Sequence, residues 1–158
     1  MKKFTLNLNK CAIALAGLCL CFFCSFSVAE EPNVFIQSLL AKCFNTEAEA
    51  KQIKKFEINV TNTGFCRYRK VYINGKQEYF SFNLSRFKEM DYYGTLEKGE
   101  LYLRTQNDDV IVQTRNDKKG DVDSMGTFMV IPLKNIDLEQ LNALNDQLKK
   151  ANTGLGGN

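Results

Sequence analysis

Histidine is absent from the 158-residue chain. It is the side chain most often used as a general base near neutral pH and a common metal ligand, so neither kind of site has its usual basis here. We expect the protein to use no metal ion and no cofactor. One serine motif is left as a catalytic candidate, because Ser85-Arg86-Phe87-Lys88 fits the S-x-x-K pattern of serine enzymes that act on cell-wall peptides or β-lactams. Its companion elements, S-D-N and K-T-G, are missing, so a small periplasmic hydrolase using Ser85 and Lys88 is the alternative hypothesis.

Acidic residues are missing from the first 29 positions, and the residue types there follow the order typical of a secretory signal peptide. Three lysines lie within the first ten residues, and an uncharged apolar stretch follows from Cys11 to Val28. Ser27-Val28-Ala29 is a small-x-small cleavage site, and Glu30 comes directly after it. We therefore predict that residues 1–29 are a cleaved signal. The mature protein is then periplasmic or secreted, with no stable membrane anchor once the signal is removed.

A surplus of either charge is missing from the mature chain. The whole sequence carries a formal net charge of +3, and three of its 21 basic residues lie in the predicted signal. The 18 basic residues that remain equal the 18 acidic ones. Nucleic acids and anionic membrane surfaces select strongly positive proteins, so we expect neither as the main partner. The chain from residue 30 has the length of one domain, and we assign residues 30–153 to it.

Cysteine is scarce once the signal is set aside. Four of the six cysteines lie in the signal, which leaves Cys43 and Cys66. An even pair in an oxidising compartment predicts a disulfide bond. The spacing is not C-x-x-C, and zinc would lack histidine ligands, so a redox or metal role is the weaker interpretation.

The apolar pattern of the mature chain predicts a helix, several strands and a second helix. Helical spacing begins at Pro32, and alternation of apolar and polar residues begins at Phe56. Segments 100–106 and 110–115 read as a hairpin, and 127–133 as a central strand covered on both faces. Asp137 and Gln140 form a capping box that starts the last helix. Gly154 is expected to end this helix, with a disordered tail at 154–158.

This order of elements predicts the α+β class. We expect a single antiparallel sheet of five to six strands, with the N-terminal and C-terminal helices packed on one face. The sequence shows no internal repeat and no linker between domains.

The segment from Phe65 to Leu84 predicts a hairpin around Asn74-Gly75. A two-residue turn would place Arg67 and Arg69 on the same face as two phenylalanines, which is wrong for a half-buried sheet. A three-residue loop, with Gly75 in the left-handed conformation, sets the apolar residues on one face instead. The predicted cross-strand pairs are Cys66 with Phe82, Tyr68 with Phe80, and Lys70 with Glu78.

The same register gives the hairpin an outward face with two arginines. Arg67, Arg69 and Tyr79 share this face, and Tyr92 and Tyr93 are expected on a loop that follows the hairpin. Tyrosine and arginine often dominate the binding energy of protein interfaces. These five residues are therefore the candidate protein interface.

The short basic start of the signal looks bacterial. The sequence therefore favours an exported, disulfide-bonded small binding protein of the bacterial periplasm. We expect an inhibitor or immunity-type partner of another exported protein.

Overall fold

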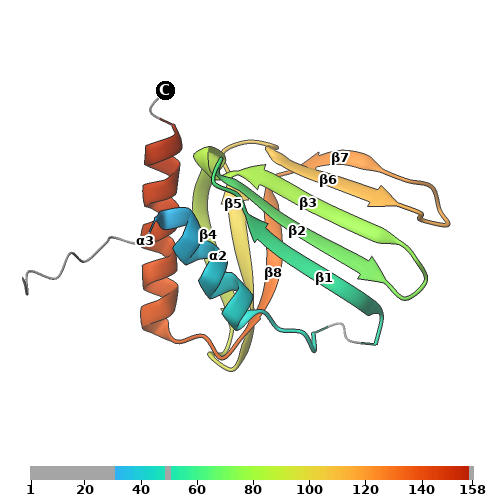
Figure 1. The fold of residues 1–158 in the computed structure, drawn as a ribbon, viewed down its shortest axis with the longest axis horizontal. Helices are drawn as coiled ribbons and strands as arrows, with labels where there is room; N and C mark the ends of the chain where they lie inside the picture. Colours follow the sequence, from blue (N-terminus) through green and yellow to red (C-terminus); the bar gives the residue numbers. More distant parts are fainter. Residues whose placement is uncertain (1–30, 49–50, 157–158) are drawn as a thin grey trace, which may run out of the picture.

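The computed structural model describes residues 31–48 and 51–156, which form two helices and two antiparallel sheets (Figure 1). The predicted signal peptide lies outside the described residues. The elements in chain order are α2 (Pro32–Cys43), β1 (Ile53–Val60), β2 (Phe65–Tyr72), β3 (Gln77–Asn83), the short 3-10 turn η1 (Leu84–Arg86), β4 (Phe87–Gly94), β5 (Lys98–Thr105), β6 (Val110–Arg115), β7 (Asp123–Gly126), β8 (Phe128–Lys134) and α3 (Leu138–Leu155).

The strands divide into two sheets, so the predicted α+β class is confirmed and the predicted single sheet is wrong. The five-stranded sheet has the order β1-β2-β3-β6-β7, and the three-stranded sheet has the order β4-β5-β8. The predicted hairpin of segments 100–106 and 110–115 does not form, because β5 pairs with β4 and β8 while β6 pairs with β3 and β7. The alternation of apolar and polar residues indicated that each strand buries one face. It did not indicate which strands pair with each other.

The strand β8 lies at one edge of its sheet rather than at the centre. Its inward residues are buried, whereas Phe128 on its other face is exposed. The outer edge of β8 is covered by the two residues that follow α2. Phe44 forms an isolated bridge with Leu133, and the Asn45 amide donates to the carbonyl of Pro132 at 2.9 Å.

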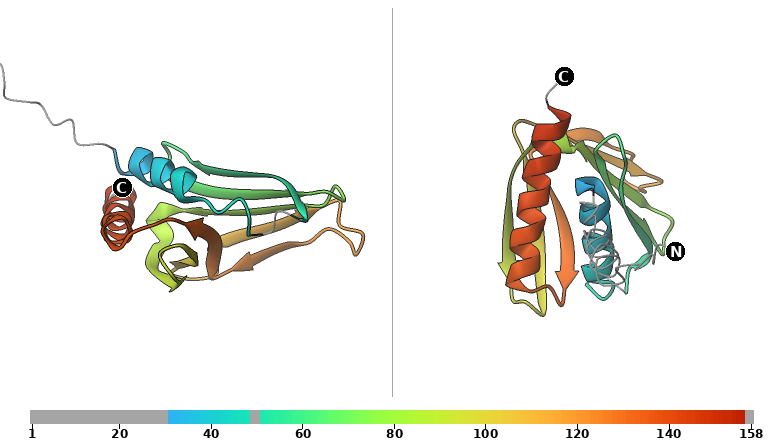
Figure 2. Two further views of the ribbon diagram at one scale, coloured as in Figure 1. Left: turned by 90° about the horizontal axis from the view of Figure 1, so that it is seen from below. Right: turned by 60° about the vertical axis from the view of Figure 1, so that its left-hand side comes forward.

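The helices pack side by side at one end of the molecule, while the loops that join β2 to β3 and β6 to β7 lie farthest from them (Figures 1 and 2). The capping box of α3 is confirmed: the Asp137 carboxylate accepts from the Gln140 amide at 2.7 Å, and the Gln140 side chain accepts from the Asp137 amide at 3.1 Å. Leu144 is among the buried residues of α3, but Leu138 is exposed. The helix continues past Gly154 to Leu155, which packs against the core.

The edge of β1 is closed by a side chain of α2. The Gln37 side-chain oxygen accepts from the Val60 amide at 2.5 Å, and its side-chain nitrogen donates to the Ile58 carbonyl at 3.2 Å. One amide side chain thus makes two of the contacts that a neighbouring strand would make.

The hairpin of β2 and β3 has the predicted register. The Tyr72 amide donates to the Lys76 carbonyl at 2.8 Å across the three-residue loop, and Gly75 has a φ of +88°. The cross-strand pairs are those expected: Cys66 with Phe82, Tyr68 with Phe80, and Lys70 with Glu78. The face of the five-stranded sheet that carries Tyr68 and Phe82 is called the inner face below, and the opposite face is called the outer face.

Cys43 and Cys66 are both buried and both free thiols, so the structure does not contain the predicted disulfide bond. Cys66 pairs with Val60, and Val60 is held by Gln37 of α2. Cys43 comes six residues later in the same helix. The disulfide bond stays a prediction from the sequence, and a thiol count tests it.

We expect a thiol count to find both cysteines free. Burial raises the pKa of the Cys66 thiol to about 12 and also raises that of Cys43. Because the thiolate is the reactive form, the folded protein starting at Glu30 should not react with a thiol reagent near neutral pH. After denaturation without reductant, two equivalents should react. No reaction of the denatured protein would show that the bond predicted from the sequence forms after all.

Candidate functional site

Three of the five predicted interface residues lie together on the outer face of the five-stranded sheet. Arg67 and Arg69 are on β2, and Tyr79 is on β3. Arg69 pairs with Tyr79 across the strands, and Arg67 pairs with Ser81. The register predicted from the sequence therefore places them correctly relative to one another.

These residues line an open depression of about 720 Å³. All of its walls come from β1, β2, β3 and β6, so no helix contributes to it. Its volume is in the range of protein cavities that hold ligands. We call the following side chains the outer patch: Glu57, Asn59, Phe65, Arg67, Arg69, Tyr79, Ser81, Ile111 and Gln113.

Arg69 and Tyr79 are fixed in place by a network of polar contacts. Arg69 donates to Glu57 at 3.3 Å and to the Gln77 side-chain oxygen at 2.7 Å. The Tyr79 hydroxyl donates to the same Gln77 oxygen at 2.5 Å, and the Arg69 guanidinium lies 5.1 Å from the Tyr79 ring centre. The hydrogen bonds that Glu57 accepts, first from Lys55 and then from Arg69, hold the pKa of its carboxyl below the ordinary value. Arg69 therefore already has a carboxylate partner within the protein, although it shares that partner with Lys55.

Arg67 is more exposed than Arg69. Its guanidinium lies 5.5 Å from the centre of the Phe65 ring. Among residues 31–48 and 51–156, it makes no ion pair. Its cross-strand neighbours Asn59 and Ser81 likewise use their side chains in no hydrogen bond within that part of the chain. Three adjacent strands thus present three unused donors in one row.

Tyr92 and Tyr93 do not join this surface. Both belong to β4 in the three-stranded sheet, whereas the sequence predicted a loop. Tyr92 packs against the core, its hydroxyl donates to the Thr95 carbonyl at 2.7 Å, and burial raises its pKa. Tyr93 is exposed and meets Tyr102 edge to face at 5.1 Å. Proximity in sequence to the hairpin was misleading because η1 carries the chain into the other sheet.

Sequence reasoning missed several members of the outer patch. The hairpin register could have identified Phe65 and Ser81. Phe65 lies two residues from Arg67 and Ser81 two residues from Tyr79, so their side chains face the same side of the sheet. Asn59 requires the pairing of β1 with β2, and Ile111 requires the pairing of β3 with β6. The last of these pairs is distant in sequence and had no local signal.

The hydrolase motif is not assembled. Ser85 lies in η1, where its amide donates to the Asn83 side chain at 2.9 Å and its carbonyl accepts from Asn152 at 3.0 Å. It lines a shallow depression to which Lys88 does not contribute. Lys88 is exposed and faces Glu89 at 3.6 Å. The structure therefore brings no base to Ser85 from this motif.

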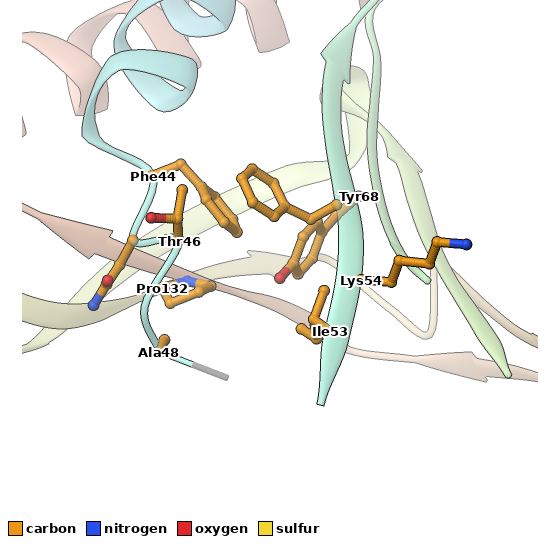
Figure 3. Close-up of a pocket in the computed structure, with 9 residues that line it drawn as sticks. Phe44, Thr46, Ala48, Ile53, Lys54, Tyr68 and Pro132 are labelled. Carbon is orange, nitrogen blue, oxygen red and sulfur yellow. The ribbon is translucent and has the colours of Figure 1, made fainter. Parts of the chain in front are cut away.

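A smaller cavity of about 200 Å³ lies on the inner side of the same sheet (Figure 3). Phe44 and Tyr68 border it, with ring centres 5.7 Å apart, and Pro132 closes another side. Ala48 and Ile53, on either side of the undescribed residues 49–50, also line it. We assign no ligand to it.

No family model matches the chain. No curated protein and no solved structure matches it either.

The part of the chain that the structure describes contains no helix that is long and apolar enough to cross a membrane. It also contains no group of three cysteine, aspartate or glutamate side chains placed to hold a metal ion.

Proposed function

We propose that the protein is an exported small binding protein of the bacterial periplasm. It uses the outer patch to bind another exported protein as an inhibitor or immunity-type partner. The observation that carries this proposal is the open depression of about 720 Å³, which gathers two arginines and two aromatic rings on an uncovered sheet face. Arginine and tyrosine are enriched among the residues that dominate binding energy at protein interfaces.

The fixed geometry of Arg69 and Tyr79 supports this proposal. Both side chains are already held by Gln77, so binding would cost little of their conformational freedom. Ile111 adds an apolar side chain that is 38% exposed beside the polar row. An apolar contact ringed by polar groups is the usual composition of a transient protein interface.

The start of the fold is compatible with export. Helix α2 begins at Pro32, and the Glu31 carbonyl accepts from the amides of Val34 and Phe35 at 2.9 and 3.1 Å. Cleavage after Ala29 would leave these contacts intact. Mass spectrometry of the protein from its host should find an N-terminus at Glu30.

We expect site-specific photo-crosslinking in the host cell to capture a partner from the outer patch. A benzophenone amino acid would replace Ile111, and the matched control would replace Phe128 on the three-stranded sheet. The two positions are similarly exposed, at 38% and 42%, and both lie on sheet faces. The expected result is one discrete adduct with an exported protein from position 111 and none from position 128.

Equal adducts from both positions, or an adduct from position 128 alone, would contradict the proposal. So would the absence of any adduct from position 111 when the melting temperature of the variant equals that of the unmodified protein. The captured protein, once purified, should bind the unmodified chain directly.

A further inference from the structure

We infer that the row Asn59–Arg67–Ser81 recognises the carboxylate of an acidic side chain in the bound partner, an inference that rests on the proposed function. The row crosses β1, β2 and β3 on the outer face, because Asn59 pairs with Arg67 and Arg67 pairs with Ser81. The row specifies the chemical group that the partner presents, which the outer patch as a whole does not.

The charges of the outer patch favour an acidic ligand. The patch holds two arginines, and Arg69 pairs at 3.3 Å with Glu57, a carboxylate that Lys55 also contacts. Arg67 has no such partner in the part of the chain that the structure describes. A carboxylate brought by the partner would complete the pattern that Glu57 and Arg69 already show one row away.

The donors of the row fit one carboxylate. Neighbouring strands lie about 4.8 Å apart, so the three side chains reach a common region above β2. The guanidinium can donate two parallel hydrogen bonds to the two oxygens, and the Ser81 hydroxyl and Asn59 amide can donate to the lone pairs that remain. None of these donors has to break a contact with another described residue in order to bind.

The surroundings of the row favour a singly charged group with an apolar neighbour. Phe65 lies beneath the Arg67 guanidinium, and Ile111 pairs with Ser81 at the other end of the row. An apolar residue next to the acid would pack on Ile111. A phosphate group carries up to two charges and would be repelled more strongly by Glu57 in the adjacent row.

The test uses two blocked peptides, acetyl-Leu-Glu-Leu-amide and acetyl-Leu-Gln-Leu-amide, with sodium acetate as a third ligand. Binding is followed by the amide chemical shifts of Asn59, Arg67 and Ser81 in the mature protein, up to about 10 mM ligand. We expect the glutamate peptide to bind about tenfold more tightly than the glutamine peptide, the usual difference for a charge-assisted hydrogen bond.

Two variants with the same loss of charge separate recognition from general electrostatics. R67Q should weaken the glutamate peptide about tenfold and abolish its advantage over the glutamine peptide. K88Q, which removes an exposed cation from the other sheet, should leave both affinities unchanged.

Equal binding of the two peptides, no shift with either peptide, or an unchanged affinity in R67Q would overturn the inference. Acetate that reproduces the shifts at the same concentration would identify a small-anion site and overturn it as well. If position 111 gives an adduct but the glutamate peptide shows no preferential binding, the outer patch is an interface that does not recognise a carboxylate. Failure of both experiments would remove the proposed function itself.

Discussion

Replacing Gly64 with alanine is expected to destabilise the protein by about 2–4 kcal/mol. Gly64 has a φ of +80°, and a left-handed conformation costs an ordinary residue about 1–2 kcal/mol. A methyl group on its Cα would also clash with the Leu155 Cδ1 atom. The flexible end of the Leu155 side chain would have to shift, which adds the loss of part of its contact with the core.

Gly75→Ala is the matched control for this substitution. Gly75 has a similar φ of +88°, but its Cβ would meet nothing within 4 Å. It should therefore lose only the backbone contribution, about 1–2 kcal/mol. Urea denaturation of both variants and of Leu155→Ala, alone and with Gly64→Ala, gives the comparison. The double variant should lose less than the sum of the two single losses, because the clash is then gone. Equal losses for the two glycine variants would show that Leu155 has no part in the effect.

Replacing Leu144 with alanine is expected to cost about 2–5 kcal/mol of unfolding free energy. Its side chain is 0% exposed on the inward face of α3, so truncation would leave a cavity in the core. Leu138→Ala changes the same residue type in the same helix, but Leu138 is 65% exposed. A surface change of this kind usually costs within about 0.5 kcal/mol.

The measurement is the midpoint of urea denaturation at an unchanged m-value. A loss below about 1 kcal/mol for Leu144→Ala would mean that the core closes over the gap. A large loss for Leu138→Ala would mean that its exposed side chain packs on something in solution.

Local features of the fold followed from the sequence because each depends on residues close together in the chain. The capping box needs only Asp137 and Gln140, and the hairpin loop needs only the left-handed Gly75 and the alternation around it. The face shared by Arg67 and Tyr79 followed from the same local register.

The division into two sheets could not be predicted from residues close together in the chain. Apolar alternation marks a strand with one buried face, but strand pairing depends on which surfaces meet in three dimensions. The β5–β6 hairpin and the placement of Tyr92 near Arg67 failed for that reason. The distinction between the two arginines was also beyond the sequence, because it depends on Glu57, which belongs to β1 and approaches Arg69 only after β1 and β2 pair.

The segment from Gln37 to Asn45 has a consequence for solubility. An uncovered edge strand offers unpaired amides and carbonyls to other chains and is a common starting point for aggregation. Gln37 occupies the edge of β1, and Phe44 and Asn45 occupy the edge of β8, so one short stretch protects one edge of each sheet. Docking of α2 therefore does more than bury apolar surface: it keeps one edge of each sheet from being extended by strands of another molecule.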